Sequence, residues 1–292
     1  MRNIVVPALI SVAIVVLAGA YIRANPAVLS ATVNSAPKES TYDRILRTGT
    51  IRCGYSVWDP LFYIDPKTNE KMGIFHDEME EAAKRLGVKV IWQEELGWGS
   101  VVEAVKSGRV DASCSGYWLN PGRIKNLLPS FPQVYSPLYV WMRQGDTRPI
   151  GKPEDLNSDQ YIAGNIDGSV DHDIIVKNFP KAKIISLPEL DSTPDLVENL
   201  VTKKVDFIVV DASTLAGYIA NNPGKIKNIF PDKPMNVFPN VILLPPDDWR
   251  FKEVMDNILR HIEYDGTLDV ILKKYHMEQS FLRNPPPVKF VP

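Results

Sequence analysis

The chain has 292 residues, of which 45% are hydrophobic and 23% are charged, and its net charge is −2. This length allows one large or two ordinary domains, and the composition is typical of a globular protein with a core of normal size. The nearly balanced charge gives no indication of a nucleic-acid partner.

The N-terminus reads as an export segment. Residues 4–22 form an almost uninterrupted apolar run between two arginines, with a small-residue cleavage site at 18–20. The run is also about long enough to span a bilayer. Residues 1–23 are therefore a signal peptide or a retained membrane anchor, and residues 24–40 are a polar, Pro-containing tether. In both cases the remaining chain lies outside the inner membrane.

The first folded segment alternates between strand and helix patterns. The alternation predicts a strand, a helix, a strand, a helix and a strand in the order 50–57, 75–87, 88–95, 99–108 and 110–116. Such a succession predicts parallel strand pairing with helices on both faces of the sheet.

A stretch of this segment is repeated, with changes, 95 residues later. The stretch "VEAVKSGRVD" at Val102–Asp111 is echoed by "VENLVTKKVD" at Val197–Asp206, again with a helix pattern before a buried strand. We therefore expect two similar α/β lobes, each with a mostly parallel sheet. The expected limits are 41–143 with 238–285 for the first lobe and 144–237 for the second, followed by a tail at 286–292.

The two cysteines, Cys53 and Cys114, both fall in predicted strands. Neighbouring strand backbones rarely offer disulfide geometry, so we expect two buried thiols. Export to an oxidising compartment would also allow one bridge, and this alternative stays open.

Several candidate site residues stand at strand ends. Arg123 follows the turn in "SGYWLNPGR", Asp211 ends the apolar run "FIVVD", and Trp58, Trp98 and Trp118 fall in loops that leave strands or open helices. Ligands of parallel α/β lobes bind at the carboxyl ends of strands. The plainer readings are a solvated turn arginine, a helix-capping aspartate and ordinary aromatic packing.

The chain resembles the family 3 extracellular solute-binding proteins, the polar-amino-acid receptors of ABC importers. The resemblance is carried by the order and spacing of "GTIRCGYS", "KMGIFHDEMEEAAKRLGVKV", "WGSVVEAVKSGRVD", "NPGR", "FPQVYSPLYVWMRQGD", "KKVDFIVVDAS" and "EYDGTLDVILKKYH". It implies the type II periplasmic binding protein fold, in which two lobes are joined by a two-strand hinge.

The resemblance also implies roles for the candidate residues. Arg123 matches the arginine that grips the ligand's α-carboxylate, and Asp211 matches the aspartate that binds its α-amino group. Trp58 and Trp98 stand close to the positions that stack the ligand side chain. Trp118 replaces what is often a small hydroxyl residue. By the 95-residue offset of the repeat, Gly116 is the first-lobe equivalent of Asp211.

The loop "NIDGSVDHD" departs from the family pattern. It keeps Gly168 and Ser169 of the Gly/Ser/Thr-rich loop that helps to hold the carboxylate, but it adds Asp167, Asp171 and His172. Acids in a first turn often only complement the helix dipole. If Asp167 faces the cleft, it would repel a carboxylate and favour a cation.

The sequence therefore predicts a monomeric periplasmic receptor without cofactor or metal that closes on an amino acid or amine-bearing carboxylate and delivers it to an inner-membrane ABC permease. The four histidines are scattered, and no catalytic motif indicates an enzyme. One alternative is a membrane-anchored sensor of the same fold. The other is a cyclohexadienyl dehydratase-like enzyme with Asp171 or His172 as general acid.

Overall fold

The computed structural model describes residues 39–283. The expected export segment, nearly all of the tether, and the tail lie outside the described residues. Among residues 39–283, no helix is both long enough and apolar enough to cross a bilayer. The regular structure belongs to one compact unit that begins at Thr41.

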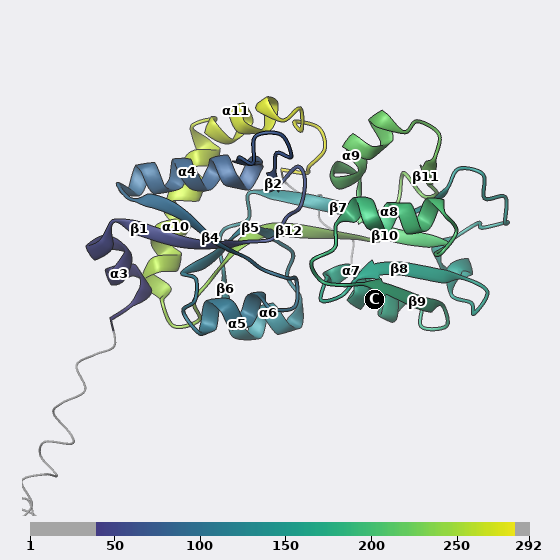
Figure 1. Ribbon diagram of the computed structural model, residues 1–292, viewed down its shortest axis with the longest axis horizontal. Helices are drawn as coiled ribbons and strands as arrows, with labels where there is room; N and C mark the ends of the chain where they lie inside the picture. The colour runs from purple at the N-terminus through teal and green to yellow at the C-terminus, as the bar shows by residue number, and fades with distance from the viewer. Residues whose placement is uncertain (1–38, 284–292) are drawn as a thin grey trace, which may run out of the picture. The chain divides into compact units, whose positions relative to one another are not determined.

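Two lobes make up this unit (Figure 1). The first lobe contains α3 (Thr41–Thr48), β1 (Thr50–Tyr55), β2 (Tyr63–Ile64), β3 (Lys71–Met72), α4 (Ile74–Leu86), β4 (Lys89–Glu95), α5 (Val101–Lys106), β5 (Ala112–Tyr117), α6 (Pro121–Asn126), β6 (Leu128–Pro129), α10 (Trp249–Tyr264) and α11 (Thr267–Lys274). The second lobe contains the short 3-10 helix Pro153–Leu156, β8 (Ile162–Ile166), α7 (Val170–Asn178), β9 (Lys183–Leu187), α8 (Thr193–Val201), β10 (Phe207–Asp211), α9 (Ala212–Asn221) and β11 (Ile226–Asn228). Two long strands, β7 (Val134–Arg143) and β12 (Asn236–Leu244), run between the lobes.

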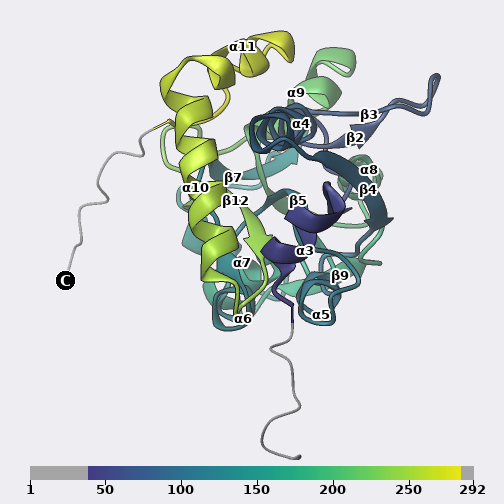
Figure 2. The same cartoon turned by 90° about the vertical axis from the view of Figure 1, so that its left-hand side faces the viewer.

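One sheet path runs through both lobes in the order β4-β1-β5-β12-β7-β10-β8-β9. The strands β1, β4 and β5 pair in parallel, as do β8, β9 and β10, whereas β12 is antiparallel to both β5 and β7. Helices lie above and below the strands of each lobe in Figure 1. Figure 2 views the first lobe from its end, where α10 lies beside α3 and α4. The predicted fold class is confirmed.

The helix α4 shows why the predicted elements form. Phe75, Met79 and Ala82 lie three or four residues apart and are all fully buried, so one face of the helix packs into the core. Gly87 ends the helix in the left-handed conformation, with φ of 76°, which a residue with a side chain adopts only with strain.

The aspartate that ends each copy of the repeated stretch forms the same set of hydrogen bonds in each lobe, here called the clasp. The main-chain N–H of Asp111 donates to the Arg52 carbonyl at 2.7 Å, and Oδ2 of Asp111 accepts the Arg52 N–H at 2.7 Å. Asp206 makes the same two bonds with Ile162, at 2.7 and 2.9 Å. Two arginine side chains also pair with each carboxylate. The clasp joins β1 to β5 in the first lobe and β8 to β10 in the second.

The expectation of two free thiols is wrong, because Cys53 and Cys114 form a disulfide. The strands β1 and β5 are parallel neighbours, and Cys53 lies opposite Ala112, so Cys114 is two residues further along the same face. This diagonal offset brings the two Cα atoms to 5.6 Å, within the usual range for a bridge.

Loss of this disulfide should lower the free energy of unfolding by up to about 4 kcal/mol, because the bridge closes a loop with a sequence separation of 61 residues. Urea unfolding with and without reductant measures the difference. The double variant Cys53→Ala/Cys114→Ala should have the same urea midpoint with and without reductant. An unchanged urea midpoint for the reduced wild type would show that the thiols are not paired.

Candidate functional site

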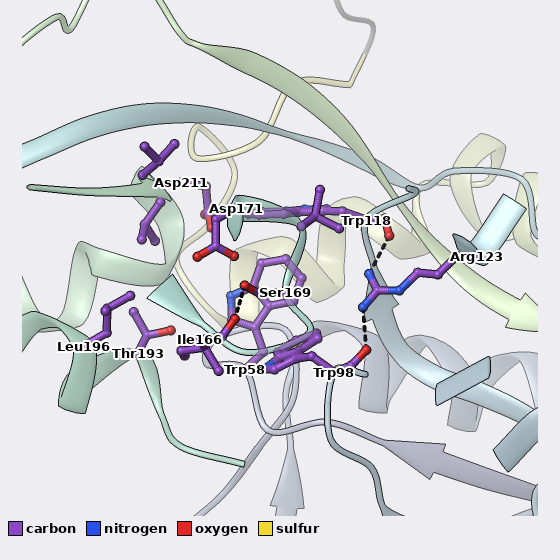
Figure 3. A pocket seen from close by; sticks show the side chains of 13 residues that line it. Trp58, Trp98, Trp118, Arg123, Ile166, Ser169, Asp171, Thr193, Leu196 and Asp211 are labelled. Carbon is purple, nitrogen blue, oxygen red and sulfur yellow. Dashed lines mark hydrogen bonds between the residues drawn. The ribbon is translucent and has the colours of Figure 1, made fainter. Parts of the chain in front are cut away.

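A cavity between the two lobes contains most of the predicted site residues (Figure 3). Its volume is about 50 Å³, and it is partly open to solvent. The first lobe contributes three tryptophans and Arg123, and the second lobe contributes Asp171, Asp211, Ser169 and an apolar lining. These residues stand after strands or in the first turns of the following helices, where parallel α/β sheets bind ligands.

Local sequence explains the position of Arg123. The segment that follows β5 begins α6 with Asn120 as N-cap and Pro121 as the first helical residue. The Asn120 side chain accepts the main-chain N–H of Arg123 at 2.9 Å. The predicted turn is thus the start of a short helix, and its cap holds the Arg123 backbone in place.

The guanidinium of Arg123 is buried without a carboxylate partner among residues 39–283. Arg123 is 3% exposed. It donates to the carbonyl oxygens of Trp118 at 2.7 Å and Trp98 at 3.0 Å, and it lies 5.3 Å from the centre of the Tyr117 ring. Burial lowers the pKa of Arg123, but a guanidinium remains charged in proteins. A buried charge that lacks an anion is a strong indication of an anionic ligand group.

The three tryptophans form one wall of the cavity. The Trp58 ring lies nearly perpendicular to Trp98 and Trp118, with ring centres 5.7 and 4.9 Å apart. Trp118 stacks on Phe238 of β12 and donates its indole N–H to Asn240 at 3.0 Å. These contacts orient the rings before any ligand arrives, so the wall offers a rigid aromatic surface.

Asp211 lies on the second-lobe side of the cavity and is 1% exposed. Its Oδ1 accepts the main-chain N–H of Thr214 at 3.1 Å and also the Ser213 hydroxyl, and its Oδ2 accepts the Thr214 hydroxyl at 2.5 Å. The plainer reading of Asp211 as the N-cap of α9 is therefore correct. Its position in the cavity wall also leaves it available to a ligand.

Asp171 is a second buried carboxyl group in the cavity, which the sequence had not singled out for ligand binding. It stands in the first turn of α7. Burial raises the pKa of Asp171 to about 6, although hydrogen bonding from Ser169 and the charges of His172 and Arg123 lower it in part. In Figure 3, Asp171 and Asp211 lie on one side of the cavity and Arg123 lies on the other.

Three predicted residues do not line the cavity. Gly116 has φ of 83°, and a Cβ there would come within 2.7 Å of the Phe75 ring, so this glycine serves packing. Asp167 is exposed, and its main chain continues the β8–β9 ladder. Gly168 is also exposed, and a Cβ there would overlap the Gly99 backbone of the first lobe.

The second lobe also contacts the first lobe outside the cavity. Glu189 accepts the main-chain N–H of Gly99 at 2.8 Å, and Asn120 donates to Asp173 at 3.3 Å. The lobes are therefore in direct contact in this structure. Within residues 39–283, no group of three or more His, Cys, Asp or Glu side chains is arranged to hold a metal ion.

The remaining lining residues are apolar or small and were not predicted from the sequence. They are Ile166, Val170, Thr193, Leu196, Val209 and Val210. Their only sequence signal was their proximity to the ends of predicted strands and the starts of predicted helices. Asp171 had a clearer signal, because it is one of the acids added to the loop that departs from the family pattern.

Comparisons with known proteins identify the family and the fold. The family model described as bacterial extracellular solute-binding proteins, family 3, matches residues 51–278. A probable histidine-binding protein of Campylobacter jejuni subsp. jejuni is 25% identical over 251 residues, which cover 85% of this chain and 91% of the relative.

Two solved structures share the fold. An ancestral amino acid-binding protein, a precursor of cyclohexadienyl dehydratase, aligns with a TM-score of 0.71 at 24% identity and covers 81% of this chain and 99% of its own. An ancestral arginine-binding protein bound to arginine aligns with a TM-score of 0.68 at 23% identity, over 78% of this chain and 98% of its own. The family model spans well over half of the sequence, so the chain belongs to the bacterial extracellular solute-binding proteins of family 3.

Proposed function

We propose that this solute-binding protein is a monomeric receptor for an amino acid. The ligand's α-carboxylate binds Arg123, its α-ammonium group binds Asp211, and its side chain lies against the tryptophan wall. Ser169 stands at the N-cap of α7, where main-chain N–H groups add to the attraction for the carboxylate.

The observation that carries this proposal is the buried Arg123 guanidinium with two donors held by carbonyl groups and no carboxylate partner in the described residues. A planar guanidinium meets a carboxylate through two parallel hydrogen bonds. A carboxylate alone would leave Asp171 and Asp211 without a cation, so a zwitterion suits the cavity better than a simple acid.

The charge balance favours a ligand with a second cationic group. Burial raises the pKa of Asp171 and of Asp211. When both carboxyl groups are ionised, they and Arg123 leave the cavity with one excess negative charge. A cationic amino acid neutralises this excess, and its side-chain cation would lie near Asp171 or against the tryptophan faces. The arginine bound by the ancestral relative and the histidine named for the Campylobacter jejuni protein belong to this chemical class.

Transport follows from a hinge between the lobes. A ligand that contacts Arg123 in one lobe and Asp211 in the other stabilises the closed form over the open form, which is the only way it drives closure. We propose that the closed receptor works in the periplasm, where residues 1–23 direct it, and that it delivers its ligand to an inner-membrane ABC permease.

A second candidate is a dehydratase activity, favoured by Asp171 alone. A buried carboxyl group with a pKa of about 6 in the cavity is suited to donate a proton to a leaving hydroxyl group. Incubation with a cyclohexadienyl alcohol tests this candidate, because loss of water yields an aromatic product with strong ultraviolet absorbance. Turnover that disappears in Asp171→Asn would replace the receptor proposal with an enzyme.

Replacement of Arg123 by Met should strongly weaken amino-acid binding, because Met fills similar volume but offers no donor to the carboxylate. A thermal-shift screen with L-arginine, L-lysine, L-histidine, L-glutamate and L-phenylalanine measures this. For the wild type, a ligand at about 100 times its Kd should add roughly 2.7 kcal/mol of stability. The loss of charged hydrogen bonds in Arg123→Met should weaken binding roughly tenfold or more.

The matched control is Lys125→Met, which removes the same charge from an exposed position of the same helix. It should keep the wild-type response. An equal response of Arg123→Met and wild type to the same ligand would contradict the site assignment.

Replacement of Asp171 by Asn should stabilise the unliganded protein at neutral pH. The folded-state pKa of about 6 lies above the ordinary value of 3.8, so ionisation of Asp171 opposes folding. The free energy of unfolding that protonated Asp171 preserves below about pH 4 is lost as pH rises toward 6. At pH 7 the wild type should be about 3 kcal/mol less stable than it would be with Asp171 at its ordinary pKa. Urea unfolding from pH 4 to 7 should show the gap between variant and wild type opening in this window.

Asp167→Asn is the matched control, because Asp167 is in the same loop but exposed. It should produce no such gap. Asp171→Asn should also weaken the binding of L-arginine and L-lysine more than the binding of L-phenylalanine. Equal effects on cationic and neutral amino acids would remove Asp171 from the proposed charge balance.

A further inference from the structure

A chain of two hydrogen bonds crosses from one lobe to the other behind the cavity. The indole N–H of Trp58, in the first lobe, lies 2.7 Å from Oγ1 of Thr214, in the second. That same oxygen lies 2.5 Å from Oδ2 of Asp211. An aromatic wall residue of one lobe is thereby connected through a single hydroxyl group to the ammonium-binding carboxylate of the other.

Chemistry fixes the direction of both bonds. An indole N–H only donates and a carboxylate only accepts, so the Thr214 hydroxyl accepts from Trp58 and gives its own proton to Asp211. A hydroxyl that accepts a hydrogen bond becomes a stronger donor. The charge on Asp211 is therefore better stabilised when Trp58 is in contact than when the lobes are apart.

The contacts of Asp211 leave a defined place for a ligand. Its two oxygens offer about four acceptor positions. The Ser213 hydroxyl and the Thr214 N–H occupy Oδ1, and the Thr214 hydroxyl occupies one position of Oδ2. Among these contacts Oδ2 has the fewer partners, and the Thr214 hydroxyl orients it.

Thr214 does not line the ligand cavity itself. It borders a separate surface cavity on the other side of Trp58, together with Val57, Asp59 and Tyr218. The side-chain hydrogen bonds of Thr214 connect it to the ligand cavity through Asp211 and Trp58.

Trp58 is positioned by its own lobe. Its main-chain N–H and carbonyl both pair with Phe62, at 2.6 and 2.8 Å, and its ring is held edge-on by Trp98 and Trp118. Because these contacts hold the Trp58 ring in the first lobe, its N–H reaches Thr214 only when the lobes are as close as they are in this structure. The hydrogen bond is thus a direct indicator of closure.

We propose that Thr214 is a positioning residue that couples lobe closure to the grip of Asp211 on the ligand's ammonium group. The proposal rests on the function proposed for Asp211. Closure adds the Trp58 bond, which strengthens the Thr214–Asp211 bond and holds Oδ2 toward the cavity.

The test compares Thr214→Val with Thr214→Ser in the full chain. Val keeps the shape but removes the hydroxyl, whereas Ser keeps both hydrogen bonds. The first measurement uses ¹⁵N-tryptophan labelling, which gives one indole N–H signal for each of the six tryptophans, and Trp58→Phe assigns the Trp58 signal. With L-arginine, L-lysine or L-histidine present, the Trp58 signal should be protected from solvent exchange in wild type and Thr214→Ser and unprotected in Thr214→Val.

The second measurement is stopped-flow binding of the same three amino acids. Thr214→Val should release the bound amino acid roughly tenfold or more faster than wild type, with an association rate within about threefold, since most affinity changes within one site appear in dissociation. Thr214→Ser should restore the wild-type rate. Adding Trp58→Phe to the Thr214→Val variant should speed release less than Trp58→Phe does in the wild type, because both changes break the same hydrogen bond.

The outcomes separate this proposal from the proposed function. Wild-type release rates in Thr214→Val, or a Trp58 signal that stays protected in that variant, would overturn the role of Thr214 and leave amino-acid binding intact. A wild type that binds none of the three probes nor any other amino acid of the screen would overturn the proposed function, and the coupling with it. A Thr214→Ser variant as defective as Thr214→Val would show that Thr214 acts through packing and not through its hydroxyl.

Discussion

The antiparallel pairing of β7 with β12 is the constraint on which the rest of the molecule depends. Residues 134–138 of β7 pair with residues 236–240 of β12, and each strand then continues into a different lobe, β7 beside β10 and β12 beside β5. A connection of only two strands can bend more easily than a wide sheet. The pairing of these two strands nevertheless keeps the two lobes facing each other. The carboxyl ends of the parallel strands in both lobes therefore contribute to the same cavity, and each lobe supplies half of the site.

Each lobe is made rigid by the same device. The aspartate that ends the repeated phrase, Asp111 or Asp206, brackets one residue of a neighbouring parallel strand with a main-chain and a side-chain hydrogen bond. Both carboxylates are further paired with arginines, so they are satisfied within their lobe. These acids and bases are structural, and they contrast with the charges that face the cavity.

Within residues 39–283, Arg123, Asp171 and Asp211 form no salt bridge. Arg123 is held by carbonyl groups, Asp211 by hydroxyl and N–H groups, and Asp171 has a raised pKa because burial disfavours its charge. Such groups lower the stability of the empty protein. In the proposed function they acquire their counter-charges from a zwitterionic ligand, so that ligand binding and lobe closure are coupled, and the hydrogen bond from Trp58 to Thr214 connects the two.

The sequence by itself determined the order of the elements and the duplicated βαβαβ plan, because strand and helix periods are local and a 95-residue repeat is visible without coordinates. It also placed Arg123, Asp211 and the tryptophans at strand ends. Only the tertiary structure decided which side chains meet. The cysteine pairing depends on a diagonal between strands 61 residues apart in sequence. Asp171 lies in the first turn of α7 and lines the cavity, whereas Asp167 precedes the glycine turn and its main chain continues the β8–β9 ladder. The contact of Trp58 with Thr214 joins residues 156 positions apart, a distance over which no local pattern carries information.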